Sequence, residues 1–391
     1  MTTNMTPSIT IFLIFLGLLR IDSFPGLETA TGTAASVPAV YVLGDSLVDA
    51  GNNNYLAISI SKTNYPHNGV DFPGSIATGR FCNGKNAADA IAEKFGLPLP
   101  PPYLSLKGIF KEEERKAAAL SGVNFASGGA GIFNGSDQQL NCGERGSNTR
   151  PSDLQSDALP TELSPQLRQS IPLSYQVNNW LSIHKELMNQ LDPSEAQIHL
   201  SKSLFFVVIG SNDIFDYFGS FKLRQKTNPQ QYTQSMADKL KEQLKIGCTP
   251  GQRAKNLMHE CDEEANTWGS LYNEALVKML QQLKEELGSS MTYSYFDNFN
   301  SLHDIVTNPA RYGTSRICFA DVKSACCGRG ELNAQLPCSL VSNLCSDRTK
   351  YLFWDLYGHP TEAAARTIVD LMLSDDSQYS SPLTLTQLVS S

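Results

Sequence analysis

The chain has 391 residues, of which 41% are hydrophobic, and a formal net charge of −8. This composition supports a large folded core and excludes a mostly disordered protein. The net negative charge and the absence of a long run of basic residues in the sequence argue against a nucleic-acid-binding surface. We find no internal repeat and no second core, so we predict one domain over residues 36–391.

An apolar run near the N-terminus, residues 9–19, is too short to span a bilayer but matches the hydrophobic core of a secretory signal. Small residues follow it, with Ala34-Ala35 as a candidate cleavage site. No Lys or Arg precedes the run, unlike a typical signal, and a buried helix is the alternative. The sequence therefore favours a signal peptide over residues 1–35 and a secreted protein without a stable membrane anchor.

The chain has nine cysteines, and five of them fall between residues 318 and 345 without the paired Cys-x-x-Cys spacing of a zinc site. We interpret them as disulfide-forming residues of an oxidising compartment. The odd count leaves at least one thiol unpaired within the chain, and the connectivity stays open. Asn134 begins the one glycosylation sequon that follows the leader.

The first predicted strand, residues 39–43, leads into Gly44-Asp45-Ser46 and a polar loop. A strand end at the rim of a parallel sheet is where open α/β sheets place their ligands, so Ser46 is a candidate nucleophile. The alternative is an ordinary turn in which the Asp and Ser side chains bond the local backbone. From this motif alone the turn is favoured.

A helix is predicted over residues 86–95, and a short strand over residues 122–126 enters a glycine-rich turn at residues 127–131. The turn lacks the Gly-Lys-Ser/Thr of a phosphate-binding loop and the full G-x-G-x-x-G pattern. We expect this turn instead to bring unshielded backbone N–H groups close to another chemical group, as glycines without side chains allow. A long polar surface insertion is predicted at residues 136–170.

After a helix over residues 171–191, a continuous apolar run at residues 204–209 predicts a strand buried on both faces. It ends in Gly210-Ser211-Asn212-Asp213. A second strand thus delivers polar residues to its C-terminal end, which points to a site at this edge of the sheet. For Asn212 taken alone, a turn or capping role is the better interpretation.

Helices are predicted over residues 229–246 and 262–287, a strand over residues 291–296, and a final helix over residues 360–373. His359 lies at or beside the N-cap of that last helix, a location that favours a neutral imidazole and hence a general base. A lone His there is more often a capping or surface residue. The presence of Asp355 a few residues upstream favours a catalytic role for His359, because its carboxylate can hold the other ring nitrogen.

Four motifs occur in the order found in the plant GDSL esterase/lipase family, a branch of the SGNH hydrolases, which the chain resembles from about residue 37 to the final helix. They are Gly44-Asp45-Ser46-Leu47, Asn124-Phe125-Ala126-Ser127-Gly128-Gly129-Ala130-Gly131, Gly210-Ser211-Asn212-Asp213 and Asp355…His359-Pro360. The resemblance implies a three-layer α/β/α sandwich with a parallel, flavodoxin-like sheet. No Gly-x-Ser-x-Gly elbow occurs, which disfavours an α/β-hydrolase.

The resemblance also implies roles for individual residues. Ser46 would be the nucleophile, His359 its general base and Asp355 the residue that orients the imidazole. The oxyanion would be held by the N–H groups of Ser46 and Gly128 and by the side-chain amide of Asn212, with Gly129 a less favoured second donor. No metal and no cofactor are needed for this chemistry.

The sequence departs from the family pattern twice. The family usually has Asp-x-x-His, whereas Gly358 is an extra residue between Asp355 and His359. An apolar strand that the family has before Cys248 is also missing, which would leave unpaired backbone groups in the sheet. We predict a secreted hydrolase that cleaves carboxylic esters, lipid-like or of an acylated plant metabolite, through an acyl-serine. The alternative is a catalytically impaired paralogue or splice form that binds a ligand.

Overall fold

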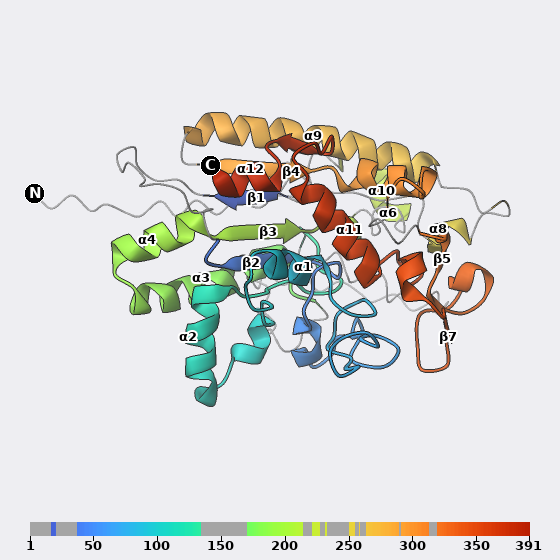
Figure 1. Cartoon of the computed structure of the whole chain (residues 1–391), viewed down its shortest axis with the longest axis horizontal. Coiled ribbons are helices and arrows are strands. Elements are labelled where there is room, and N and C mark those ends of the chain that lie inside the picture. The colour runs from blue at the N-terminus through green and yellow to red at the C-terminus, as the bar shows by residue number, and fades with distance from the viewer. Residues whose placement is uncertain are drawn as a thin grey trace, which may run out of the picture.

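A computed structural model of the chain describes residues 17–20, 37–133, 170–213, 221–226, 231–232, 250–254, 258, 263–288, 291–312 and 319–391 (Figure 1). The predicted leader over residues 1–35 lies outside the described residues except at 17–20. The insertion at 136–170, apart from Ser170, the sequon at Asn134 and most of the helix predicted over 229–246 also lie outside them.

The main sheet contains five strands in the order β2-β3-β1-β4-β9. Their bounds are β1 Gly17–Arg20, β2 Val40–Gly44, β3 Leu204–Val208, β4 Thr292–Phe296 and β9 Ser380–Pro382. The predicted parallel pairing is present between β2 and β3, where Val40 lies opposite Leu204. The sheet is nevertheless mixed and not parallel throughout, because β1 is antiparallel to both β3 and β4 and β9 is antiparallel to β4.

The short strand predicted at residues 122–126 is a single bridging residue. Asn124 forms parallel bridges with Val42 and with Pro102. The N–H of Phe125 donates to the carbonyl of Val42 at 2.7 Å, so this segment runs along the outer side of β2. The glycine-rich turn that follows is thereby brought to the same edge as Ser46.

The helices are α1 Ala87–Lys94, α2 Glu112–Ser121, α3 Leu173–Gln190, α4 Pro193–Lys202, α6 Phe221–Lys226, α8 Pro250–Arg253, α9 Glu263–Leu287, α10 Asn298–Thr307, α11 Glu362–Leu373 and α12 Leu385–Ser390. Among the described residues, none of these helices is long and apolar enough to cross a membrane.

Helices cover both faces of the sheet. The side chains of β2 alternate in direction, so this apolar strand presents hydrophobic side chains to each face. Tyr41 and Leu43 pack into a buried cluster with residues of α2, α3 and α9. Val40 and Val42 pack into a second cluster with residues of α1, α10, α11 and α12. The chain thus has an α/β fold whose apolar strands are buried on both faces, as the run at residues 204–209 predicted.

Local sequence sets where the helices begin. The side chain of Asn86 accepts from the N–H of Asp89 and completes a capping box at the start of α1. Thr361 caps α11 through the N–H of Ala364. The last helix therefore begins at Glu362, not at residue 360 as predicted, because Pro360 pairs with Phe353 in an isolated bridge.

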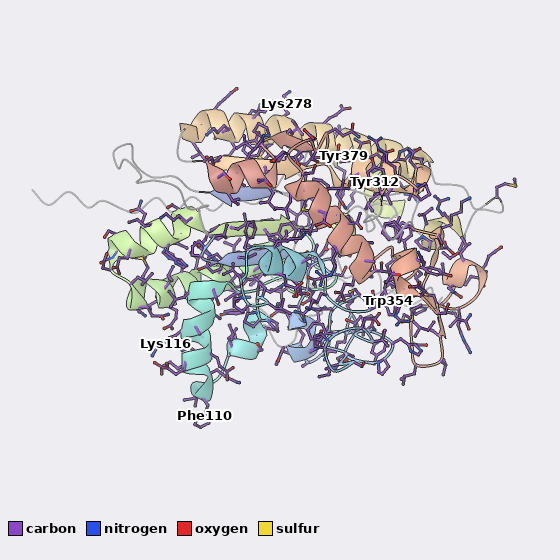
Figure 2. The ribbon with its side chains drawn as sticks, viewed as in Figure 1. Phe110, Lys116, Lys278, Tyr312, Trp354 and Tyr379 are labelled. Carbon is purple, nitrogen blue, oxygen red and sulfur yellow. A yellow bond between two sulfur atoms is a disulfide. The ribbon has the colours of Figure 1, made fainter. Side chains whose placement is uncertain are left out.

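Two disulfides hold the segment that precedes the final helix. Cys326 is bonded to Cys345 and Cys327 to Cys338, which confirms the disulfide prediction for these four residues. They form a small buried cluster with Trp354, labelled in Figure 2. Cys82 is buried as a free thiol, whereas Cys142, Cys248, Cys261 and Cys318 lie outside the described residues.

Two shorter sheets complete the described strands. β5 (Asp321–Ala325) pairs in parallel with β8 (Tyr351–Phe353), and β6 (Cys327–Gly328) pairs with β7 (Asn343–Leu344). β8 leads directly into the loop of Asp355 and His359. The disulfide cluster and β5 therefore fix the base of that loop.

Candidate active site

Ser46 lies just beyond the C-terminal end of β2, held there by the close approach of β2 and β3. The N–H of Asp45 donates to the carbonyl of Val208 at 2.8 Å. Gly44 has a φ of +157°, and a Cβ at this position would lie 2.1 Å from the carbonyl oxygen of Val208. Only glycine fits here, so the strand can turn sharply and present the serine at the edge of the sheet.

The side chains of Ser46, His359 and Asp355 form one chain of hydrogen bonds. His359 Nε2 lies 2.8 Å from Ser46 Oγ, and its Nδ1 lies 2.6 Å from Asp355 Oδ2. A carboxylate can only accept, so Nδ1 carries the proton and Nε2 presents its lone pair to the serine hydroxyl. His359 and Asp355 are both buried, which shields their contact from water.

The extra Gly358 is accommodated without separating Asp355 from His359. Gly358 adopts a φ of +84°, a left-handed conformation that glycine allows at little cost. Its N–H donates to the carbonyl of Asp355 at 3.1 Å and closes the loop. Asp355 Oδ1 also accepts from the N–H of Tyr357 at 3.0 Å. The loop therefore folds around the carboxylate and still delivers the imidazole to it.

In the glycine-rich turn, one of the two predicted backbone oxyanion donors already has a hydrogen-bond partner within the chain. The N–H of Gly128 donates to Asp49 Oδ2 at 2.9 Å, so this group is already occupied. Among the described residues, nothing accepts from the N–H of Gly129 or from that of Ser46. Gly129 has a φ of +83°, which only a glycine adopts readily in so tight a turn.

Asn212 follows β3, and its side-chain Nδ2 donates to the carbonyl of Ala130 at 2.8 Å. This bond orients the amide and uses one of its two hydrogens. Its neighbours also join the strand ends together. Ser211 Oγ donates to Asp45 Oδ2 at 2.8 Å, and Asp213 accepts from the N–H groups that follow the glycine-rich turn.

The residues missed by sequence reasoning form a buried polar network under the site. Asp49 Oδ1 accepts from the N–H groups of Gly51 and Asn52, at 2.7 and 2.8 Å. The side-chain amide of Asn52 donates to the carbonyls of Asn124 and Ala126. The signal that could have revealed this network is the polar run at residues 49–54, which is too rich in Asn for a loop that faces only water.

Two buried carboxylates lie in this network. Burial raises the pKa of Asp45 to about 6, although the N–H of Leu47 and the hydroxyl of Ser211 act in the opposite direction. Burial likewise raises the pKa of Asp49 to about 6, against its backbone hydrogen bonds. Burial and the charge of Asp355 together raise the pKa of Tyr357. The site is thus a region of low effective dielectric constant, in which hydrogen bonds to charge are strong.

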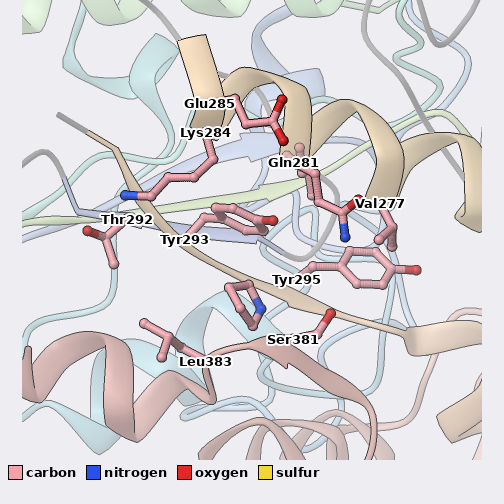
Figure 3. A pocket seen from close by; sticks show the side chains of 11 residues that line it. Val277, Gln281, Lys284, Glu285, Thr292, Tyr293, Tyr295, Ser381 and Leu383 are labelled. Carbon is pink, nitrogen blue, oxygen red and sulfur yellow. The ribbon is translucent and has the colours of Figure 1, made fainter. Parts of the chain in front are cut away.

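A pocket of about 500 Å³ lies away from these residues, between α9 and strands β4 and β9 (Figure 3). Its lining includes Gln281 and Tyr295 but no member of the Ser46 chain. Lys284, which also lines it, donates to the carbonyls of Gly288 and Met291 and is thereby tied to the end of α9. Among the described residues, no group of three or more His, Cys, Asp or Glu side chains is placed to hold a metal ion.

A serine bonded to a buried His–Asp pair, with backbone and amide N–H groups at the neighbouring strand ends, is the arrangement of a serine hydrolase. The family comparison agrees, since the model of the GDSL-like lipase/acylhydrolase family matches residues 40–372. The chain belongs to this family, as the four sequence motifs indicated, and is accordingly a GDSL esterase/lipase of the carboxylic ester hydrolase class.

Several curated proteins of Arabidopsis thaliana are similar over nearly their whole length. One GDSL esterase/lipase is 70% identical over an alignment that covers 100% of both chains. Two others are 34% and 33% identical and cover 92% and 96% of this chain. The first alignment runs over 408 positions, 17 more than the 391 residues of this chain, so that relative has residues where this chain has none.

Proposed function

We propose that the protein hydrolyses carboxylic esters through an acyl-serine intermediate formed on Ser46. The observation that carries the proposal is the chain of contacts from Ser46 Oγ to His359 Nε2 and from His359 Nδ1 to Asp355 Oδ2, at 2.8 and 2.6 Å. These are the distances at which a base can take the serine proton while a carboxylate holds the ring.

In the first half of the reaction, Ser46 Oγ attacks the ester carbonyl while His359 Nε2 takes its proton. The resulting imidazolium is stabilised by Asp355, which stays ionised. The tetrahedral oxyanion accepts hydrogen bonds from the N–H of Ser46, from that of Gly129 and from the second amide hydrogen of Asn212. We assign Gly129 in place of Gly128 because the N–H of Gly128 is bonded to Asp49.

The tetrahedral intermediate then collapses. The bond from the carbonyl carbon to the alcohol oxygen breaks, and His359 gives its proton to the leaving alcohol. In the second half, His359 takes a proton from water, which attacks the acyl-serine, and the acid is released as Ser46 recovers its proton. Each oxyanion donor is worth roughly 3 kcal/mol in such a step, and the base contributes about 10²- to 10⁴-fold.

Substrate class, location and layer architecture form the finer part of the proposal. The substrate is a small-molecule ester, either lipid-like or an acylated plant metabolite. This substrate class is inferred by analogy at the level of the fold. The protein is secreted, which the disulfides support because such bonds persist in oxidising compartments. The sheet with helices on both faces is proposed as a three-layer α/β/α sandwich.

The test uses the purified chain with a fluorophosphonate probe and a short-chain nitrophenyl ester. We expect the wild type to become labelled and to turn over the ester, and Ser46→Ala to do neither while keeping its thermal unfolding midpoint. Ser121→Ala, at the exposed end of α2, is the matched control and should behave as the wild type does. A folded wild type that neither labels nor exceeds Ser46→Ala would overturn the proposal in favour of a ligand-binding protein.

A further inference from the structure

The ring of Phe81 lies against the imidazole of His359. The centroids of the two rings are 5.1 Å apart, and the ring planes are inclined by 40°. Both side chains are buried, with 9% of Phe81 and 7% of His359 exposed. Ring pairs at this separation attract each other beyond the effect of their burial. Phe81 is therefore a direct neighbour of the base, although it takes no part in the hydrogen-bond chain from Ser46 to Asp355.

The same ring also touches the glycine-rich turn. A Cβ added to Gly128 would lie 2.3 Å from Cζ of Phe81 and 2.6 Å from its Cε2, so the edge of the ring rests on the backbone of this glycine. The next residue, Gly129, is the oxyanion donor that we assign in this turn. Asn53 also holds the turn, because its Nδ2 donates to the carbonyl of Gly128 at 2.7 Å. One ring thus joins the base to the turn that carries an oxyanion donor.

The backbone that carries Phe81 is anchored on both sides of the ring. Arg80 precedes it and forms a buried ion pair with Asp89 of α1, in which Nε and Nη2 each lie 2.7 Å from a carboxylate oxygen. Asn83 follows it, and its Oδ1 accepts from the N–H of Glu362 at 2.9 Å. Glu362 is the first residue of α11, the helix that follows the loop of the base. The ring is therefore mounted on that helix and on α1.

The imidazole needs more than its hydrogen bond to Asp355 to stay in place. That bond restrains Nδ1, but hydrogen bonds tolerate a broad range of angles, so Nε2 can still tilt away from Ser46 Oγ. A side chain packed against the ring limits this tilt. Tyr357 pairs with the imidazole at 6.0 Å, but 54% of Tyr357 is exposed. The buried ring of Phe81 is the more firmly held of the two neighbours.

We propose that Phe81 is a positioning residue for ester hydrolysis. Its ring restrains the imidazole so that Nε2 faces Ser46 Oγ, and it sets the spacing between the base and the oxyanion donor of the glycine-rich turn. The assignment rests on the proposed function, because Phe81 acts through the proton transfers of His359. A displacement of about 1 Å in such a site can cost about 10²-fold in rate, so the loss of this spacing is large enough to measure.

The leaving alcohol distinguishes positioning from simple packing. A nitrophenolate can leave the tetrahedral intermediate without a proton, whereas an alkoxide must take one from the imidazolium of His359 as it leaves. A misplaced imidazole therefore slows the hydrolysis of an alkyl ester more than that of a nitrophenyl ester. A loss of folded enzyme slows both to the same extent. The readout is the ratio of kcat/KM for an ethyl ester to kcat/KM for the nitrophenyl ester of the same acid.

The test compares Phe81→Leu with the wild type in the full chain. Leucine is apolar but lacks Cζ and Cε2, the ring atoms that meet Gly128. We expect kcat/KM to fall by about tenfold for the nitrophenyl ester and by about a hundredfold for the ethyl ester, so that the ratio falls about tenfold. Phe81→Met is measured beside it, because its longer side chain fills more of the space and preserves the fold. Its ratio should fall too, since a flexible side chain cannot hold the imidazole.

Phe299→Leu is the matched control. Phe299 is 6% exposed, and its ring pairs with that of His303 on the same helix, α10, at 6.3 Å. This change should lower the thermal unfolding midpoint by as much as Phe81→Leu does and leave the ratio within a factor of two of the wild type. A folded Phe81→Leu or Phe81→Met with the wild-type ratio, or an equal fall of the ratio in Phe299→Leu, would overturn the proposal.

The wild type tests the proposed function separately. A wild type that neither takes the fluorophosphonate label nor turns over either ester would refute that function and the role of Phe81 with it. An active wild type whose ratio is unchanged in the Phe81 variants would refute the role of Phe81 alone.

Discussion

Gln176 pairs with both backbone groups of Gly44. Its Oε1 accepts from the N–H of Gly44 and its Nε2 donates to the carbonyl of Gly44, each at 2.7 Å. The same Nε2 donates to the carbonyl of Ile171 at 2.7 Å. Gln176 is completely buried on α3, so a single side-chain amide fixes the strand end two residues before Ser46.

Gln176→Met is expected to lower both stability and turnover. Methionine fills a similar volume but leaves the N–H of Gly44 without a partner, while the carbonyl of Gly44 keeps its bond from the N–H of Ser127. One buried donor without a partner costs about 1–3 kcal/mol of unfolding free energy. We expect a loss of about 2 kcal/mol in urea unfolding and a tenfold or larger fall in kcat, because the turn that presents Ser46 loosens.

The matched control for this change is Gln190→Met at the C-terminal end of the same helix. Gln190 makes only long contacts, at 3.3 and 3.4 Å, to the carbonyls of Lys116 and Glu186. The Gln190→Met variant should keep kcat within a factor of two of the wild type and its unfolding free energy within about 0.5 kcal/mol. If the two variants had the same kcat, the role of Gln176 in positioning the serine would be refuted.

Gly358→Ala is expected to reduce activity through the loop of the base. Alanine in a left-handed conformation costs about 1–2 kcal/mol, which the loop can relieve only by moving. Gly96→Ala offers the same backbone strain at a φ of +69°, with nothing within 4 Å of the added Cβ. Both variants should unfold about 1 kcal/mol more easily, whereas only Gly358→Ala should lower kcat/KM. Unchanged kcat/KM in Gly358→Ala would mean that the loop holds His359 by other contacts.

Asn212→Ala is expected to reduce kcat by about 10²- to 10³-fold with a small change in KM, because an oxyanion donor acts mainly in the transition state. The loss of its bond to the carbonyl of Ala130 should cost only about 1 kcal/mol of stability. Steady-state kinetics with the nitrophenyl ester measure the split. Asn308→Ala, at the exposed end of α10, is the control. A change in KM alone would assign Asn212 to substrate binding instead.

Much of the site could be predicted because its residues follow strand ends. Apolar runs indicated β2 and β3, and parallel pairing alone brings Ser46 and Asn212 to one edge. The bond that leads us to propose Gly129 in place of Gly128 could not be predicted, because its acceptor is Asp49, a residue 79 positions away. Such a pairing is a tertiary contact and leaves no local pattern in the sequence.

The fold was predictable in class but not in its central strand. Residues 9–19 have the hydrophobic pattern of a leader, and nothing in that pattern shows that four residues, 17–20, pair with β3 and β4. The antiparallel β9 was missed for a similar reason, since Ser380-Ser381-Pro382 lacks the apolar alternation of a strand. In both cases the partner strands determine the conformation, which single-sequence periodicity cannot express.

Asp45→Asn is expected to flatten the dependence of stability on pH. Because burial raises the pKa of Asp45 from 3.8 to about 6, the folded state holds this proton more tightly than the unfolded state does. Its stabilising contribution is present in full below about pH 4 and is lost as the pH rises through about 6, by on the order of 2–3 kcal/mol. Asparagine removes the titration and can still be satisfied, because its oxygen accepts from the N–H of Leu47 and its amide donates to the hydroxyl of Ser211.

The measurement is urea unfolding of the wild type and the variant at pH 4, 5, 6 and 7. The wild-type unfolding free energy should fall more steeply over this range than that of Asp45→Asn. Asp49, whose pKa is raised in the same way, remains in both proteins and contributes the same slope to each. Parallel curves for the two proteins would show that Asp45 is already ionised at pH 4 in the folded state, and that its hydrogen bonds from Leu47 and Ser211 outweigh the cost of burying its charge.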